Sequence, residues 1–152
     1  MKQPQVTDAI LIVVADQRRA RLAAGKRLRN GRVHVEALSR LEEQWDESLH
    51  KNPPSRSDVS GHVFDNRGHT DGERIHRFAR EMLQWLDGER PKHAWERMIL
   101  FAEPRLLGAL RREAPSALQK EWKEYALDLS GLSDGELALR PEVLELLPKL
   151  PV

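Results

Sequence analysis

The sequence predicts an α/β fold built on one mixed sheet of about five strands, with elements in the order β-β-β-α-β-α-β-α. Residues 98–101 form a continuous apolar run, which is typical of a strand covered on both faces and therefore central in a sheet. Pro104 follows closely, and because it lacks an N–H it favours the first position of a helix. Residues 8–38 instead hold three strand patterns joined by short turns, which predicts an antiparallel meander.

The three strands of the meander are short and close together in the sequence. We expect them at residues 8–15, 20–24 and 32–38. The first is rich in Ile and Val, as a buried strand is. The third alternates between apolar and polar residues, so we expect it to be half exposed.

A long loop is expected after the meander, over residues 41–71. This stretch is polar and contains Pro53, Pro54, Gly61 and Gly68. Loops longer than about 15 residues are often functional or disordered, which makes this loop a functional candidate. It ends at Thr70-Asp71-Gly72-Glu73, a capping-box pattern, and apolar residues at helical spacing then predict a helix to about residue 87.

The second half of the chain alternates between strands and helices. Pro115 indicates a short extra turn or helix, and residues 122–129 alternate imperfectly, as a last strand. The Ser133 to Glu136 segment repeats the capping-box pattern, and Pro141 favours the start of a final helix that Pro148 ends.

Length and composition set limits on the class of protein. With 152 residues and 39% hydrophobic residues, we expect a single domain over residues 1–152. The absence of cysteine excludes disulfides and thiolate metal sites. The apolar run of residues 9–15 is far shorter than the roughly 20 residues that span a bilayer, and no secretion signal is recognisable. We therefore expect no membrane span and a cytoplasmic location.

Charge is segregated although the net charge is only +1. Seven basic residues with no acid between them lie within residues 18–32, and acidic residues follow. Such a basic cluster is a candidate for contact with nucleic-acid phosphates, through Arg18, Arg19, Arg21, Arg27 and Arg29. The alternative is an ordinary solvated hairpin.

Four blocks of the sequence resemble, in order, the bacterial host-attachment protein family (protein required for attachment to host cells). They are Val13-Val14-Ala15-Asp16 with Ala20-Arg21-Leu22, then Arg77-Phe78-Ala79-Arg80-Glu81, then the strand and helix start of residues 97–111, and Asp128-Leu129-Ser130. That family is similar to the central domain of eukaryotic and archaeal class-one release factors and of Pelota. The resemblance covers nearly the whole chain and implies a three-layer, ribonuclease-H-like fold.

The same resemblance implies contact with RNA or the translation machinery. In termination factors the domain carries a Gly-Gly-Gln tripeptide, and this chain has no Gly-Gly dipeptide, so peptide release is not expected. Asn66, Arg67 and His69 of the predicted loop could donate hydrogen bonds to phosphates. Gly61 and Gly68 would let the backbone approach closely. The alternative is a flexible, solvated loop.

Catalytic motifs are few. Asp16, Glu103 and Asp128 stand at the ends of predicted strands, where carboxylates could hold metal ions in a nuclease-type site. Each could equally cap a helix or open a turn. No phosphate-binding loop, dinucleotide fingerprint or nucleophile elbow is present, so we expect no cofactor.

Two functions therefore stay open, beside the less favoured nuclease. The first is a non-catalytic binding module that associates with RNA or the ribosome. The second is a host-attachment factor, acting directly or through the expression of surface components, with another protein as its partner. The sequence does not determine the oligomeric state.

Overall fold

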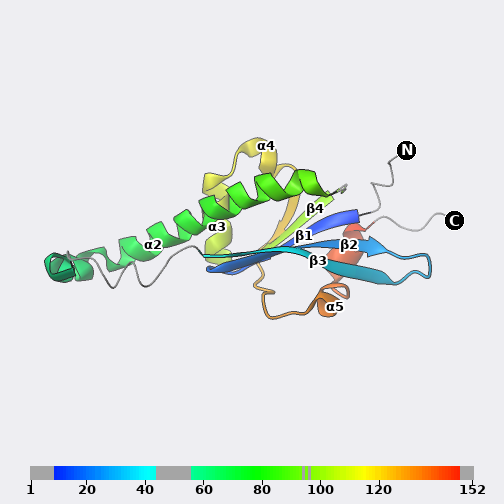
Figure 1. Cartoon of the computed structure of the whole chain (residues 1–152), viewed down its shortest axis with the longest axis horizontal. Coiled ribbons are helices and arrows are strands. Elements are labelled where there is room, and N and C mark those ends of the chain that lie inside the picture. The colour runs from blue at the N-terminus through cyan, green and yellow to red at the C-terminus, as the bar shows by residue number, and fades with distance from the viewer. Residues whose placement is uncertain (1–8, 44–55, 94, 96, 148–152) are drawn as a thin grey trace.

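The computed structural model describes residues 9–43, 56–93, 95 and 97–147. Within them the chain forms five strands and several helices (Figure 1). In chain order these are β1 (Ala9–Ala15), β2 (Arg19–Arg27), β3 (Val33–Glu42), α2 (Arg56–Glu89), the 3-10 helix η2 (Arg90–Lys92), β4 (Arg97–Ala102), α3 (Pro104–Glu113), α4 (Ser116–Gln119), β5 (Trp122–Tyr125), α5 (Asp134–Leu137) and α6 (Pro141–Leu146).

The strands form one mixed sheet in the order β3-β2-β1-β4-β5. β1, β2 and β3 pair antiparallel, whereas β4 runs parallel to β1 and β5 parallel to β4. The predicted meander and the central position of residues 98–101 are therefore confirmed. Hairpin connections between the first strands and helical crossovers between the later ones produce this arrangement.

Helices cover both faces of the sheet, which gives the three predicted layers. Odd-numbered residues of β1, such as Leu11 and Val13, join the side chains of α2 and α3 in one core cluster. Even-numbered residues, such as Ile10 and Ile12, pack on the other face with the short helices α5 and α6. β1 contributes apolar side chains to the cores on both faces of the sheet, and its sequence is therefore a continuous apolar run.

Helix α2 begins much earlier than the sequence predicts. It starts at Arg56, so the loop predicted over residues 41–71 is wrong for residues 56–71, and the capping-box pattern at residues 70–73 lies inside the helix. β3 also takes residues 41–42 of that loop, while residues 44–55 lie outside the described residues.

The error arises because apolar residues at helical spacing mark the part of a helix that is buried, and not the whole length of the helix. Buried positions of α2 recur at helical spacing from Ile75 to Leu86, where the helix covers the sheet. The earlier half extends beyond the end of the sheet (Figure 1). The described strands do not lie beside that half, so they impose no apolar stripe on its sequence.

The last third of the chain agrees with the predicted turn chemistry, with one shorter strand. Ser133 and Glu136 form the predicted capping box, and Pro141 occupies the first turn of α6. β5 ends at Tyr125 instead of residue 129, because the amide of Leu127 turns back to the carbonyl of Tyr125. Pro148 lies outside the described residues. Across the described part, no helix is long and apolar enough to cross a membrane.

Candidate functional site

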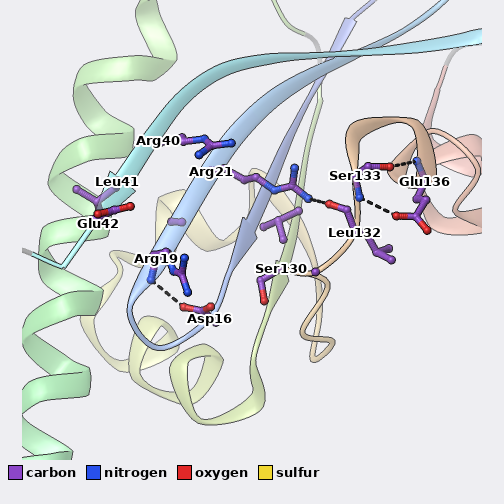
Figure 2. Close-up of a pocket in the computed structure, with 13 residues that line it drawn as sticks. Asp16, Arg19, Arg21, Arg40, Leu41, Glu42, Ser130, Leu132, Ser133 and Glu136 are labelled. Carbon is purple, nitrogen blue, oxygen red and sulfur yellow. Dashed lines mark hydrogen bonds between the residues drawn. The ribbon is translucent and has the colours of Figure 1, made fainter.

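A groove of about 590 Å³ opens at the carboxyl end of β1, on the face of the sheet that α5 and α6 cover. Parts of residues 14–21, 40–42 and 130–136 form it (Figure 2). We call it the β1 groove. In open α/β sheets, ligands are commonly bound just beyond the carboxyl ends of the strands, so this is the position where the fold favours a site.

Three arginines project into the β1 groove from one face of the sheet. Arg19 and Arg21 are two residues apart on β2, and Arg40 of β3 is paired directly with Arg21. Side chains two residues apart on a strand, or directly opposite on antiparallel strands, share a face. Figure 2 shows Arg40 beside Arg21, with Arg19 nearer the turn.

A β-bulge in β3 brings Arg40 to this face. Ala23 pairs with Ala37 and Leu22 with Ser39, so Leu38 is an extra residue on β3. Upstream of the bulge, the odd-numbered Val35 faces the α5 and α6 side, and strict alternation would place Arg40 on the opposite face. The extra residue reverses the alternation, as bulges near binding sites often do.

The three arginines differ in how they are held. The guanidinium of Arg21 is ion-paired with Asp134 at 3.1 Å and donates to the carbonyl of Leu132. Its Nε is buried without an acceptor in the described part of the chain. Arg19 and Arg40 are exposed, and no hydrogen bond or ion pair joins either guanidinium to another described residue.

The carboxylates of the groove are engaged in local structure. Oδ1 of Asp16 accepts hydrogen bonds from the backbone N–H groups of Arg18 and Arg19, both at 2.8 Å. Glu136 accepts from the N–H of Ser133 at 2.8 Å, and this bond holds the pKa of Glu136 below its ordinary value. Glu42 is not without a partner either.

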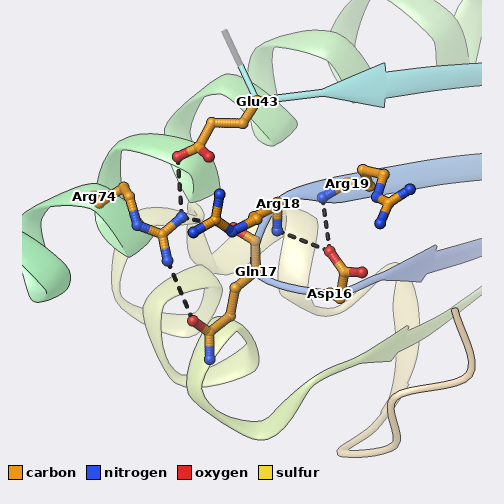
Figure 3. A network of polar contacts seen from close by, with 6 residues as sticks. All are labelled: Asp16, Gln17, Arg18, Arg19, Glu43 and Arg74. Carbon is orange, nitrogen blue, oxygen red and sulfur yellow. Dashed lines mark hydrogen bonds and ion pairs between the residues drawn. The ribbon is translucent and has the colours of Figure 1, made fainter. Parts of the chain in front are cut away.

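The turn beside the groove is fixed from the α2 side by a mostly buried ion pair (Figure 3). Arg74 of α2 donates to Glu43 at 3.0 Å, and these side chains are only 14% and 11% exposed. Arg74 also donates to the carbonyl and the side-chain oxygen of Gln17, at 3.3 and 3.4 Å. The amide of Glu43 donates to the carbonyl of Arg18. α2, the end of β3 and the β1–β2 turn are thereby joined at one point.

The predicted basic cluster is split between two ends of the sheet. Arg18, Arg19 and Arg21 lie at the groove end of β2, whereas Arg27 ends that strand and Arg29 is exposed in the turn after it. Arg27 donates to the carbonyl of Gly31 at 3.3 Å. Eight residues of strand separate Arg19 from Arg27, which is about 26 Å. The five arginines do not form one patch, because an extended strand carries sequence neighbours far apart.

The other predicted contact residues lie on α2. Asn66, Arg67 and His69 belong to the helix, as do Gly61 and Gly68. The interpretation of these glycines as points of close loop approach is wrong, because no loop exists there.

The three candidate metal carboxylates all bond to nearby backbone. Besides Asp16, Glu103 caps α3 by accepting from the N–H of Leu106 at 2.9 Å, and Asp128 accepts from the N–H of Ser130 at 3.1 Å. Within the described ranges, no group of three His, Asp or Glu residues is placed to hold a metal ion. Each of the three carboxylates thus accepts a hydrogen bond from the backbone of a turn or a helix start.

Two residues of the site were missed in the sequence, Arg40 and Arg74. Arg40 lies at the end of a strand expected to stop at residue 38, and Arg74 lies near the expected start of a helix. No local signal identifies either one, since each acquires its role from a partner distant in sequence.

The sheet and the groove define an α/β protein with helices on both faces and a charged site at the carboxyl end of its central strand. The chain belongs to the family described as protein required for attachment to host cells, whose model matches residues 11–140. Every residue that lines the β1 groove falls within that range. None of the curated proteins matches the chain in sequence.

Proposed function

We propose that this chain serves the attachment of a bacterium to its host cell and that it does so by binding a ligand in the β1 groove, without catalysis. The observation that carries the proposal is that the match to the attachment family, over residues 11–140, includes the whole groove. Binding is favoured over acid–base chemistry because Asp16 and Glu136 already accept hydrogen bonds from backbone N–H groups. A general acid or base needs its carboxyl group within reach of the reacting atom.

The test is a host-cell adhesion assay with a strain that lacks this chain, complemented with variants. The wild-type chain should restore adhesion, and Arg19→Gln with Arg40→Gln should not, because the variant lacks the two groove guanidinium groups that contact no other described residue. The matched control is Arg29→Gln with Arg32→Gln, which removes the same charge from exposed residues at the other end of the hairpin. Normal adhesion of the deletion strain would refute the attachment role. Full complementation by the Arg19 and Arg40 variant would refute the use of the groove.

The second candidate is a non-catalytic module that associates with RNA or the ribosome, as the resemblance to the release-factor central domain implies. In that case the chain stays in the cytoplasm, and attachment depends on it indirectly through the synthesis of surface components. Arg18, Arg19 and Arg40 at one end of the sheet favour it, since exposed arginines are suited to phosphate contacts. The mixed sheet with helices on both faces is consistent with a ribonuclease-H-like layout.

Co-sedimentation with ribosomes across a salt series separates this candidate from direct attachment. Association through phosphate contacts should weaken steeply as salt rises, because bound counterions are released. It should also be lost in the Arg19 and Arg40 variant. If no association occurs even at low salt, and fractionation finds the chain at the cell surface, the second candidate is wrong.

A further inference from the structure

We propose that the β1 groove binds a small phosphate monoester of about mononucleotide size, with the guanidinium groups of Arg19 and Arg40 holding the phosphate. This inference rests on the proposed use of the groove as the binding site, and it names the chemical class of the ligand. It concerns residues contributed by β2 and β3 at one end of the sheet (Figure 2).

The charges available to a ligand in the groove are positive. Among the described residues, equal numbers of arginine and acidic side chains line the groove, but the two kinds differ in what they already bind. Asp16 and Glu136 are bonded to backbone N–H groups, and Glu42, which is not without a partner, lies directly opposite Arg19 across β2 and β3. The guanidinium groups of Arg19 and Arg40 have no partner among the described residues. An anion can therefore bind without breaking an existing contact, whereas a cation would have to compete for the carboxylates.

The pairing of Arg40 with Arg21 also points to an anion. These two residues face each other directly across β2 and β3, where Cβ atoms are about 4.5–5.5 Å apart and like charges destabilise the sheet. Asp134 neutralises Arg21 from one side, and Glu42 is the residue opposite Arg19 in the next pair on this face, but no ion pair joins Arg40 to a described residue. A bound anion beside Arg40 would relieve this repulsion.

Two free guanidinium groups favour phosphate over a singly charged anion. Arginine offers parallel N–H groups that match two oxygens of a phosphate or carboxylate, and each such pair is stronger than a neutral hydrogen bond. A phosphate monoester has three terminal oxygens and close to two negative charges near neutral pH. It can therefore engage Arg19 and Arg40 at the same time, which a carboxylate does less completely.

The size of the groove favours a small molecule over a polymer. A volume of about 590 Å³ lies within the roughly 300–1,000 Å³ of small-ligand pockets. Val14 and Leu132 are among the residues that line it, so apolar side chains are present beside the arginines. The segment of residues 130–136 forms another side of the groove. An organic group attached to the phosphate fits this combination.

The experiment is calorimetric titration of the purified chain at constant ionic strength, with inorganic phosphate, AMP and adenosine as separate probes. Phosphate and AMP should bind saturably, AMP more tightly, and adenosine should not bind. Arg19→Gln with Arg40→Gln should weaken AMP binding at least tenfold. Arg29→Gln with Arg32→Gln should leave it unchanged. Both double variants should fold, because the four arginine side chains are exposed, and thermal melting without ligand verifies this.

Several outcomes would overturn the inference. The first is that neither phosphate nor AMP binds saturably at millimolar concentration. The second is that the Arg19 and Arg40 variant still binds AMP as the wild-type chain does. The third is that adenosine binds as tightly as AMP. A 12-nucleotide RNA without a terminal phosphate is the fourth probe. If it binds through Arg19 and Arg40 while AMP and phosphate do not, the ligand is a polymer instead.

The result is distinguishable from a failure of the proposed function. If the groove variant loses host adhesion but the wild-type chain binds neither phosphate nor AMP, the groove is the site and the ligand class is wrong. If AMP binds through Arg19 and Arg40 while the deletion strain adheres normally, the site stands and the attachment role is wrong.

Discussion

Replacing Arg74 with methionine tests how strongly the ion pair between α2 and the end of β3 holds the molecule together. The methionine side chain keeps most of the arginine's aliphatic volume but donates no hydrogen bond. It leaves the carboxylate of Glu43, whose side chain is 11% exposed, without its cation, and Gln17 without a donor to its carbonyl. The change therefore removes the charge and the hydrogen bonds while largely preserving the packing.

The magnitude follows from the burial and lengths of these contacts. Removing one partner from a fully buried ion pair costs about 3–5 kcal/mol. Here both side chains keep some exposure, and the two bonds to Gln17 are longer than the 3.0 Å bond to Glu43. We therefore expect about 3 kcal/mol less stability for Arg74→Met, at the lower end of that range. For a chain of this size, this lowers Tm by about 6–12 °C.

A double-mutant cycle with Glu43→Gln separates the pair from its surroundings. Glu43→Gln keeps an oxygen that can accept from Arg74, so it should cost about 1.5–2 kcal/mol. The double variant leaves no unpaired buried charge, and its loss should fall short of the sum of the two single losses by at least about 1 kcal/mol. Urea denaturation followed by tryptophan fluorescence measures all three. Additive losses within about 0.3 kcal/mol, or a loss below about 1 kcal/mol for Arg74→Met, would refute the reasoning.

Three further predictions concern the helices around the sheet. Phe78→Ala removes a ring of α2 that is 1% exposed in the core between this helix and the sheet. Urea denaturation should show a free energy of unfolding lower by about 3–5 kcal/mol. A decrease below about 1.5 kcal/mol would contradict this burial. Glu103→Ala removes the cap that accepts from the N–H of Leu106, and should cost about 1 kcal/mol with the same loss in the presence and absence of Mg²⁺. A hydrogen bond from His76 and the charge of a nearby arginine lower the pKa of Glu113 in the folded chain. The ionised Glu113 side chain therefore stabilises the fold fully above the ordinary glutamate pKa of about 4.3. This stabilisation is lost as pH falls below that value, through the lowered pKa of the folded chain. Thermal melts from pH 6 to pH 3 should show the Tm advantage of the wild-type chain over Glu113→Gln shrinking with acid, and a constant difference would show that the bond does not depend on ionisation.

Burial was the property that the sequence predicted best. β1, β4 and the second half of α2 are apolar because neighbouring layers cover them, and in each case the apolar period marks the element correctly. The capping box at Ser133 and the proline at the start of α6 were also predictable, since their geometry is local. The first half of α2 was not, because it passes beyond the sheet and shows no such period (Figure 1).

The candidate site was predicted only in part. Arg19 and Arg21 were selected for their place in a basic segment, but Arg27 was selected with them although the length of β2 carries it to the other end. Arg40 depends on the bulge at Leu38. A bulge is set by how two strands pair, and the alternation within one strand does not reveal it.

The two helical layers of the sheet are unequal, and this has a dynamic consequence. α2 and α3 have 34 and 10 residues, whereas α5 and α6 have 4 and 6. Helices this short do not persist without packing, so the layer that they form should open by local unfolding at a lower free energy than the strands beneath it. The wall of the β1 groove belongs to that layer. Access to the groove is thus expected to open and close while the sheet and the α2 side stay folded, and backbone amides of residues 130–147 should exchange with solvent before those of β1.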